Sequence, residues 1–102
     1  MRDFKKLDIW KNGIELVKQV YQLSNKLPSE EKFGLRSQIT RASISVPSNI
    51  AEGCSRNSEV ETQLIIAQEL NFIKEKELES IFTLIHKEAK MINSLINKIK
   101  NS

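Results

Sequence analysis

Apolar residues recur every three or four positions through most of the chain, which is the spacing of helical faces. We predict a first helix over about residues 7–27, which ends before Pro28 because proline disfavours helical geometry in the preceding residue. This helix carries two apolar stripes: Leu7, Trp10, Ile14, Val17 and Tyr21 in one, and Ile9, Leu16, Val20, Leu23 and Leu27 in the other. Two stripes are more than one neighbour would cover, so the helix lies between two neighbours or contacts another subunit.

A second helix is predicted over about residues 30–52, or from Gly34 if the chain bends there. Ser29 and the two glutamates after it form a suitable helix start. The apolar stripe of this helix comprises Leu35, Ile39, Ala42, Val46 and Ile50. Pro47 lies inside the run, so we expect a kink with helix on both sides, and Gly53 suits the position after the helix end.

The segment Cys54–Asn57 is predicted to be a loop, and the capping box Ser58–Glu61 starts a third helix over about residues 58–71. After Leu70 the apolar register breaks, which permits either a turn near Asn71–Lys74 or one long helix that changes face. We favour the turn, because asparagine tolerates the left-handed backbone conformation. A fourth helix follows over about residues 75–100, and only Glu88 interrupts its apolar stripe.

These elements predict one all-α domain over residues 1–102, an antiparallel up-down four-helix bundle with a shortened third helix. A third helix of roughly 12–14 residues would be about 20 Å long. Parts of the other three helices would then lack a partner in the bundle, or would find one on another subunit.

The composition excludes several kinds of chemistry. With one histidine (His86) and one cysteine (Cys54), the chain cannot build a zinc site or an internal disulfide. Ser45 and Ser48 lack a nearby base, so we expect neither an enzyme nor a cofactor. No apolar run is long enough to span a membrane, and the charged amphipathic start differs from a signal peptide. We therefore expect a cytoplasmic protein.

The 16 Lys and Arg residues outnumber the 13 Asp and Glu residues, which gives a formal charge of +3. Such a charge permits a nucleic-acid partner without requiring one. The candidate phosphate-binding residues are Arg36, Arg41, Arg56, Lys87 and Lys90. Glutamates partly cancel the lysines of the last helix, so a concentrated basic surface requires an oligomer that aligns several copies. Phe33 and Phe72, in predicted bends, could stack on bases or simply pack against helix ends.

The second helix also carries a polar stripe. Its members are Gln38, Arg41, Ser45, Ser48 and Glu52, with Asn49 beside them. Three interpretations remain: a solvated face, a structural polar network inside the bundle or at a subunit interface, or direct contact with a ligand.

The segment from Phe33 to Gly53, which contains FGL, QITRA and SISVPSNIAEG, resembles one family closely. It is similar to the four-helix-bundle proteins encoded in 23S rRNA intervening sequences of bacteria. Residues 7–11, 61–64 and 90–96 resemble other parts of the same family. Members usually carry a longer stretch between the equivalents of Gly53 and Glu61, which this chain lacks.

The resemblance implies a homo-oligomer, and a relative, the accessory protein of diversity-generating retroelements, is a pentamer with a basic nucleic-acid-binding surface. Our first hypothesis is therefore a non-enzymatic, self-associating bundle that binds RNA or DNA through a basic surface multiplied by oligomerisation. The alternative is a protein–protein adaptor that docks through the polar stripe of the second helix.

Overall fold

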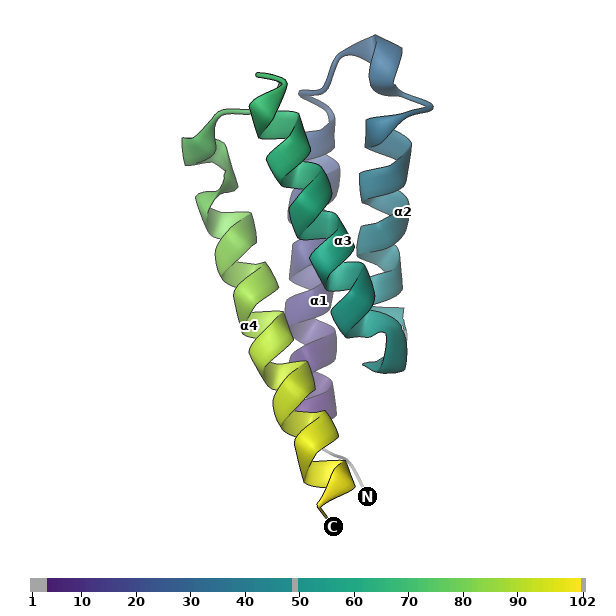
Figure 1. The fold of residues 1–102 in the computed structure, drawn as a ribbon, viewed down its shortest axis with the longest axis vertical. Helices are drawn as coiled ribbons and strands as arrows, with labels where there is room; N and C mark the ends of the chain where they lie inside the picture. The colour runs from purple at the N-terminus through teal and green to yellow at the C-terminus, as the bar shows by residue number, and fades with distance from the viewer. Residues whose placement is uncertain (1–3, 49, 102) are drawn as a thin grey trace.

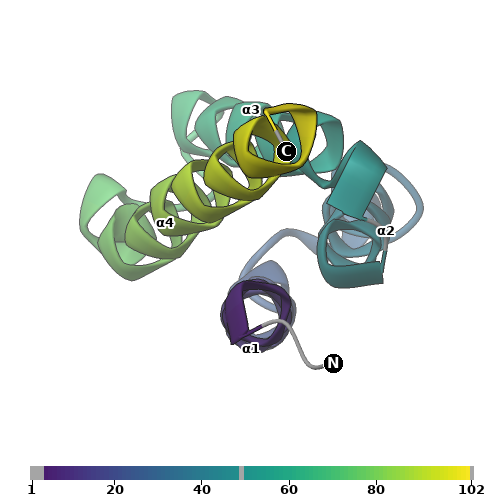
Figure 2. The same ribbon diagram turned by 90° about the horizontal axis from the view of Figure 1, so that it is seen from below.

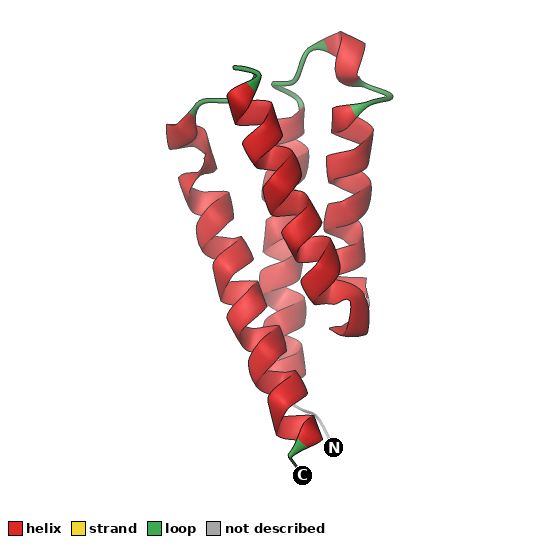
Figure 3. Ribbon diagram, viewed as in Figure 1, coloured by secondary structure: helices red, strands yellow, loops and turns green. Residues whose placement is uncertain are grey.

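The computed structural model describes residues 4–48 and 50–101. Four helices follow one another along the chain: α1 (Phe4–Ser24), α2 (Leu35–Ser48), α3 (Ile50–Glu69) and α4 (Glu75–Lys100). A short 3-10 turn, η1 (Ser29–Glu31), lies between α1 and α2. Figure 3 shows that short loops join these helices.

Each helix runs antiparallel to the helix that follows it (Figure 1). Contacts join α1 to α2, α2 to α3, α3 to α4 and α4 back to α1. Figure 2 accordingly shows α1 opposite α3, and α2 opposite α4. This arrangement confirms the predicted all-α, up-down four-helix bundle.

The core is built from one stripe of each long helix. On α1 it is the second predicted stripe that is buried, and its members are Ile9, Leu16, Val20, Leu23 and, just after the helix, Leu27. On α4 the buried apolar residues are Leu78, Ile81, Ile85, Ile92 and Leu95. Each side chain of this size contributes roughly 1.5–3 kcal/mol when it leaves water. Ile9, Ile92 and Leu95 form a separate small cluster, and Cys54 of α3 packs against it.

The prediction of a shortened third helix is wrong. α3 contains 20 residues and begins at Ile50, whereas α2 contains 14 and is the shortest helix. The chain reverses direction between Ser48 and Ile50, so Pro47 lies in the last turn of α2 and does not kink a continuing helix. The predicted loop Cys54–Asn57 and the predicted capping box Ser58–Glu61 both lie inside α3.

The start of α2 also differs from the main prediction. α1 ends at Ser24, before residue 27, and α2 begins at Leu35, which agrees with the alternative start at Gly34. The Glu31 carboxylate accepts a hydrogen bond from the Leu35 backbone N–H at 3.2 Å, so it satisfies one free donor of the helix end.

The turn between α3 and α4 is where the sequence places it. Asn71 has a φ of 64°, in the left-handed region. The Phe72 N–H donates to the Ala67 carbonyl at 3.0 Å, and the Asn71 N–H donates to the Gln68 carbonyl at 2.9 Å. These two bonds form a Schellman motif, which ends α3 and starts the chain reversal.

Two glycines allow the helices to approach closely. A Cβ atom added to Gly13 of α1 would lie 2.8 Å from the Pro47 Cβ atom and 2.9 Å from a Glu88 carboxylate oxygen. A Cβ atom on Gly53 of α3 would lie 2.9 Å from Ile92. Gly53 therefore serves helix packing, and its predicted role at the end of the second helix is wrong.

We predict that Gly13→Ala makes the protein about 1–2 kcal/mol less stable. The new methyl group overpacks the contact with the rigid Pro47 ring, which costs up to about 3 kcal/mol, and the higher helix propensity of alanine offsets ~1 kcal/mol of that loss. Urea unfolding followed by circular dichroism measures the change. Gly34→Ala is the control and should stay within about 0.5 kcal/mol of wild type, because its nearest neighbour is the movable end of Glu31 at 3.1 Å. Equal stability of the two variants would contradict the prediction.

Candidate functional site

A carboxylate lies inside the bundle. Glu88 of α4 is 0% exposed, and its Oε1 atom accepts a hydrogen bond from the Asn12 amide of α1 at 3.0 Å. The same Asn12 amide also donates to the Leu84 carbonyl at 3.0 Å. Among the described residues, the Oε2 atom of Glu88 has no hydrogen-bond partner.

Burial raises the pKa of Glu88 to about 7, and the hydrogen bond from Asn12 opposes this shift only in part. The half-buried Cys54 of α3, whose thiol donates to the Asn93 side chain at 3.3 Å, also has a raised pKa. Burial is the larger cause, and the negative charge of Glu88 adds to it. Cys54 is therefore held in the thiol form, which is a poor nucleophile.

Asn57 of α3 makes a second polar contact inside the bundle. Its amide donates to the Ile85 carbonyl of α4 at 2.8 Å, and the residue is buried. Sequence reasoning missed Asn12 and Asn57 and treated Glu88 only as an interruption. The available signal was register: Asn12 falls between Ile9 and Leu16 on the buried stripe of α1.

The polar stripe predicted on the second helix does not form a network inside the protomer. Gln38, Arg41 and Glu52 are exposed. The Ser45 hydroxyl donates to the Arg41 carbonyl at 3.2 Å, and the Ser48 hydroxyl donates to the Ile44 carbonyl at 2.7 Å, both within α2. Glu52 lies on α3, beyond the turn, and Asn49 lies outside the described residues.

The predicted phosphate-binding residues do not converge on one surface of the protomer. Arg36 and Arg41 lie on α2, whereas Lys87 and Lys90 lie on α4, and these helices are opposite each other. Arg56 of α3 pairs with Glu59 at 3.0 Å. The two lysines nevertheless belong to a longer basic feature of α4.

This feature, which we name the lysine stripe, runs along the outer surface of α4. Its seven residues are spaced by three or four positions, so they share one face of the helix, and all are exposed. The lysine stripe comprises Lys76, Ser80, Thr83, Lys87, Lys90, Ser94 and Lys98. It spans about 33 Å of helix and contains no carboxylate, although Glu79 flanks it and Asp8 of α1 lies near Lys90.

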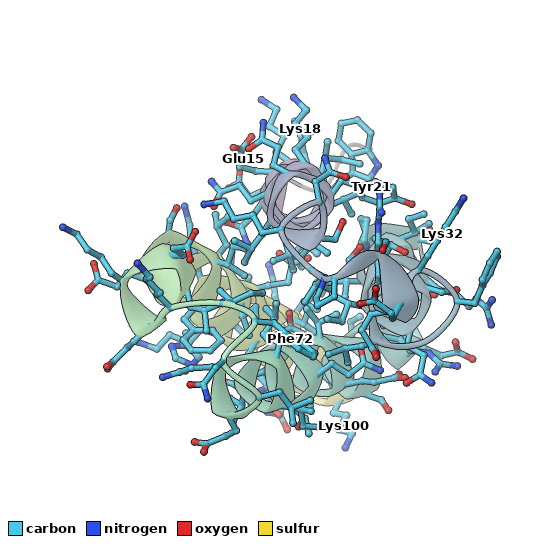
Figure 4. The ribbon with its side chains drawn as sticks, turned by 90° about the horizontal axis from the view of Figure 1, so that it is seen from above. Glu15, Lys18, Tyr21, Lys32, Phe72 and Lys100 are labelled. Carbon is cyan, nitrogen blue, oxygen red and sulfur yellow. The ribbon has the colours of Figure 1, made fainter. Side chains whose placement is uncertain are left out.

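Exposed or half-buried apolar side chains lie on both flanks of α2, which itself exposes Ile44 together with Gln38, Arg41 and Ser48. We name these apolar residues together the apolar face. It begins with the first predicted stripe of α1, which its own chain leaves exposed or only half-buried, and Trp10 retains 52% of its exposure. Figure 4 shows Tyr21 on the α2 side of α1, with Glu15 on the other side. The apolar face comprises Leu7, Trp10, Ile14, Val17 and Tyr21 of α1, Ile44 of α2, and Ile66 and Leu70 of α3.

The side on which Ile66 and Leu70 lie follows from helical geometry. Ile66 follows Asn57 by nine positions, about two and a half turns, so the two side chains point in opposite directions from α3. Because Asn57 contacts α4, Ile66 points away from α4, and Leu70 lies one turn beyond it. Since α2 is opposite α4, the apolar face and the lysine stripe occupy opposite sides of the bundle.

Within residues 4–48 and 50–101, no helix is long and apolar enough to cross a membrane. The same residues contain no group of three or more His, Cys, Asp or Glu side chains arranged to hold a metal ion.

We predict that the buried Glu88 carboxyl makes stability fall as pH rises. Its pKa is about 7 in the folded chain against an ordinary 4.5, so the folded state binds more protons between these values and stability declines across this window. The loss is roughly 3 kcal/mol at complete ionisation. Glu88→Gln should remove this decline and be the more stable protein at pH 8. Urea unfolding of both proteins at several pH values tests this, and parallel profiles would contradict it.

Comparison with known proteins gives the family of the chain. None of the curated proteins matched the sequence. A family model for 23S rRNA-intervening sequence proteins matches residues 5–59, which include α1, α2 and the first half of α3. The match covers more than half of the 102 residues and agrees with the resemblance in the Phe33–Gly53 segment. The chain therefore belongs to the 23S rRNA-intervening sequence protein family.

Proposed function

We propose that this chain is a non-enzymatic protein that self-associates through the apolar face and binds RNA or DNA along the lysine stripe. The observation that carries the proposal is the placement of these two features on opposite sides of the bundle. Copies that pack through the apolar face leave α4 pointing outward. The assembly then presents several lysine stripes on its outer surface, although each protomer has a charge of only +3.

The apolar face supports contact between copies. Trp10, Tyr21, Ile44, Ile66 and Leu70 are exposed large apolar side chains, and monomeric proteins seldom gather so many on one side. They lie on both flanks of α2, from α1 to α3, so the α1 part of one copy can pack against the α3 part of the next. Such head-to-tail contacts between two different patches generate a ring when the rotation between copies closes, and an open filament when it does not. A pentamer, as in the relative named above, is one such closed assembly.

The lysine stripe supports contact with phosphates. Four lysines along about 33 Å of helix span about the length of one duplex turn. Lysine and hydroxyl side chains contact phosphates without reading sequence, so we propose binding that depends on salt and little on base identity. The stripe lies outside the segment that matches the family, so this support comes from the chain itself.

We predict that Trp10→Glu shifts the protein towards the monomer. Half of the Trp10 surface is exposed in the protomer, so the variant should keep its helical content while the contact loses roughly 2–3 kcal/mol. Light scattering after size exclusion at micromolar concentration measures the mass. Gln22→Glu, with the same charge change at an exposed position of α1 outside the apolar face, should keep the wild-type mass. A monomeric wild-type protein would exclude self-association and favour the adaptor alternative.

We predict that replacing Lys87 and Lys90 together by glutamine weakens duplex binding similarly for every sequence. The slope of log Kobs against log salt should become shallower by up to about 2 for each protomer that contacts the duplex. Fluorescence anisotropy at several salt concentrations measures the slope. Replacing Lys11 and Lys18 of α1 by glutamine is the matched control, because both are exposed and lie outside the stripe. No binding by wild type at low salt, or equal effects of the two double variants, would refute this assignment.

A further inference from the structure

A groove of about 460 Å³ lies between α1 and α2 at the end of the bundle next to η1. Its lining includes two aromatic residues (Tyr21 and Phe33), two cationic residues (Lys32 and Arg36) and Thr40. None of the residues that line it is acidic. Figure 4 shows Tyr21 on α1 and Lys32 on the η1 side, seen along the bundle. An anionic, partly aromatic ligand suits this combination.

Phe33 is the most exposed large apolar side chain among the described residues, at 89%. It lies in the turn between η1 and α2, and the Lys32 ammonium is 5.6 Å from the centre of its ring. Phe72, the other aromatic residue considered for stacking, is partly buried and packs against the core. A flat ring in water beside a cation is the combination on which unpaired bases stack.

Arg36 provides a positioned cation in the same groove. Its guanidinium donates to the Asn25 side-chain oxygen at 2.8 Å, which orients the half-buried side chain. In the described part of the chain Arg36 forms no ion pair, so its charge is not neutralised by a carboxylate. Glu31, on the neighbouring turn, is engaged with the Leu35 N–H at the start of α2. The free N–H groups of Arg36 can therefore bind phosphate.

We infer that this groove binds an unpaired nucleotide of a single-stranded RNA or DNA, with the base against Phe33 and a phosphate at Lys32 and Arg36. The inference rests on the proposed function, that the chain binds nucleic acid, and it adds a preference for single strands. A paired base is already stacked in its duplex and cannot cover the Phe33 ring. Tyr21 lines the groove and is also the last residue of the apolar face on α1, so the groove lies at the edge of that face.

The test compares a fluorescein-labelled uridine oligomer with a duplex RNA of the same length, by anisotropy at low salt. Phe33→Ala should weaken oligomer binding roughly 5- to 150-fold, the range of one lost stacking contact, and should change duplex binding less than about 2-fold. Phe33→Trp should restore the affinity. Phe33→Leu should not, because leucine is apolar but has no aromatic face. Arg36→Ala should weaken oligomer binding as well.

Each other outcome identifies what has failed. If wild type binds the duplex through Lys87 and Lys90 but Phe33→Ala binds the oligomer as tightly as wild type, the groove inference is wrong and the proposed function stands. If Phe33→Leu binds the oligomer like wild type, or Phe33→Ala changes the mass of the assembly, the side chain is an apolar subunit contact and the inference is wrong. If wild type binds neither RNA, the proposed function fails and the inference fails with it.

Discussion

The arrangement of the bundle depends on the point at which Gly13 of α1 meets Pro47 of α2 and Glu88 of α4. Because Gly13 has no side chain, three helices approach each other around a carboxylate that is removed from water. Asn12, the residue before Gly13, donates to that carboxylate and to the α4 backbone, so one turn of α1 sets both spacing and register. A hydrogen-bonded polar group in a core favours one packing arrangement over its alternatives, at some expense in stability.

That arrangement gives each side of the protomer a different character. With α2 opposite α4, the unburied stripe of α1 lies with Ile44 and Ile66 on one side, and the lysine stripe of α4 lies on the other. Neither the charge of the lysine stripe nor the exposed area of the apolar face is large, since the stripe carries four lysines and the apolar residues are partly buried. Their separation allows one surface to be used for assembly while the other stays in contact with solvent. The groove next to η1 lies at the edge of the apolar face, and its cations set it apart from the apolar residues around it.

The parts of the fold that local sequence determines were predicted, and those that distant contacts determine were not. The long period of α4 and the left-handed Asn71 are local signals, and both predictions are confirmed. Gly53 and Asn57 are residue types that are common in loops, yet both lie in α3. There Gly53 packs closely against Ile92, and Asn57 donates to the Ile85 carbonyl, so both contacts are with residues far along the chain. Lys87 and Lys90 were proposed as phosphate-binding residues because of their charge. Their separation from the arginines of α2 depends on the order of the helices in the bundle, which residue spacing does not reveal.

The unequal helix lengths have a consequence for how the molecule opens. Figure 1 shows α1 and α4 continuing as a pair below the α2–α3 turn, while the larger cluster of buried residues draws on all four helices. Two helices bury less surface per residue than four, so we expect the backbone amides of this pair to exchange with solvent through local fraying that leaves the rest of the bundle intact. We therefore expect one end of the bundle to have a lower local stability than the other. Leu7 and Trp10, the first residues of α1 that belong to the apolar face, lie at the less stable end.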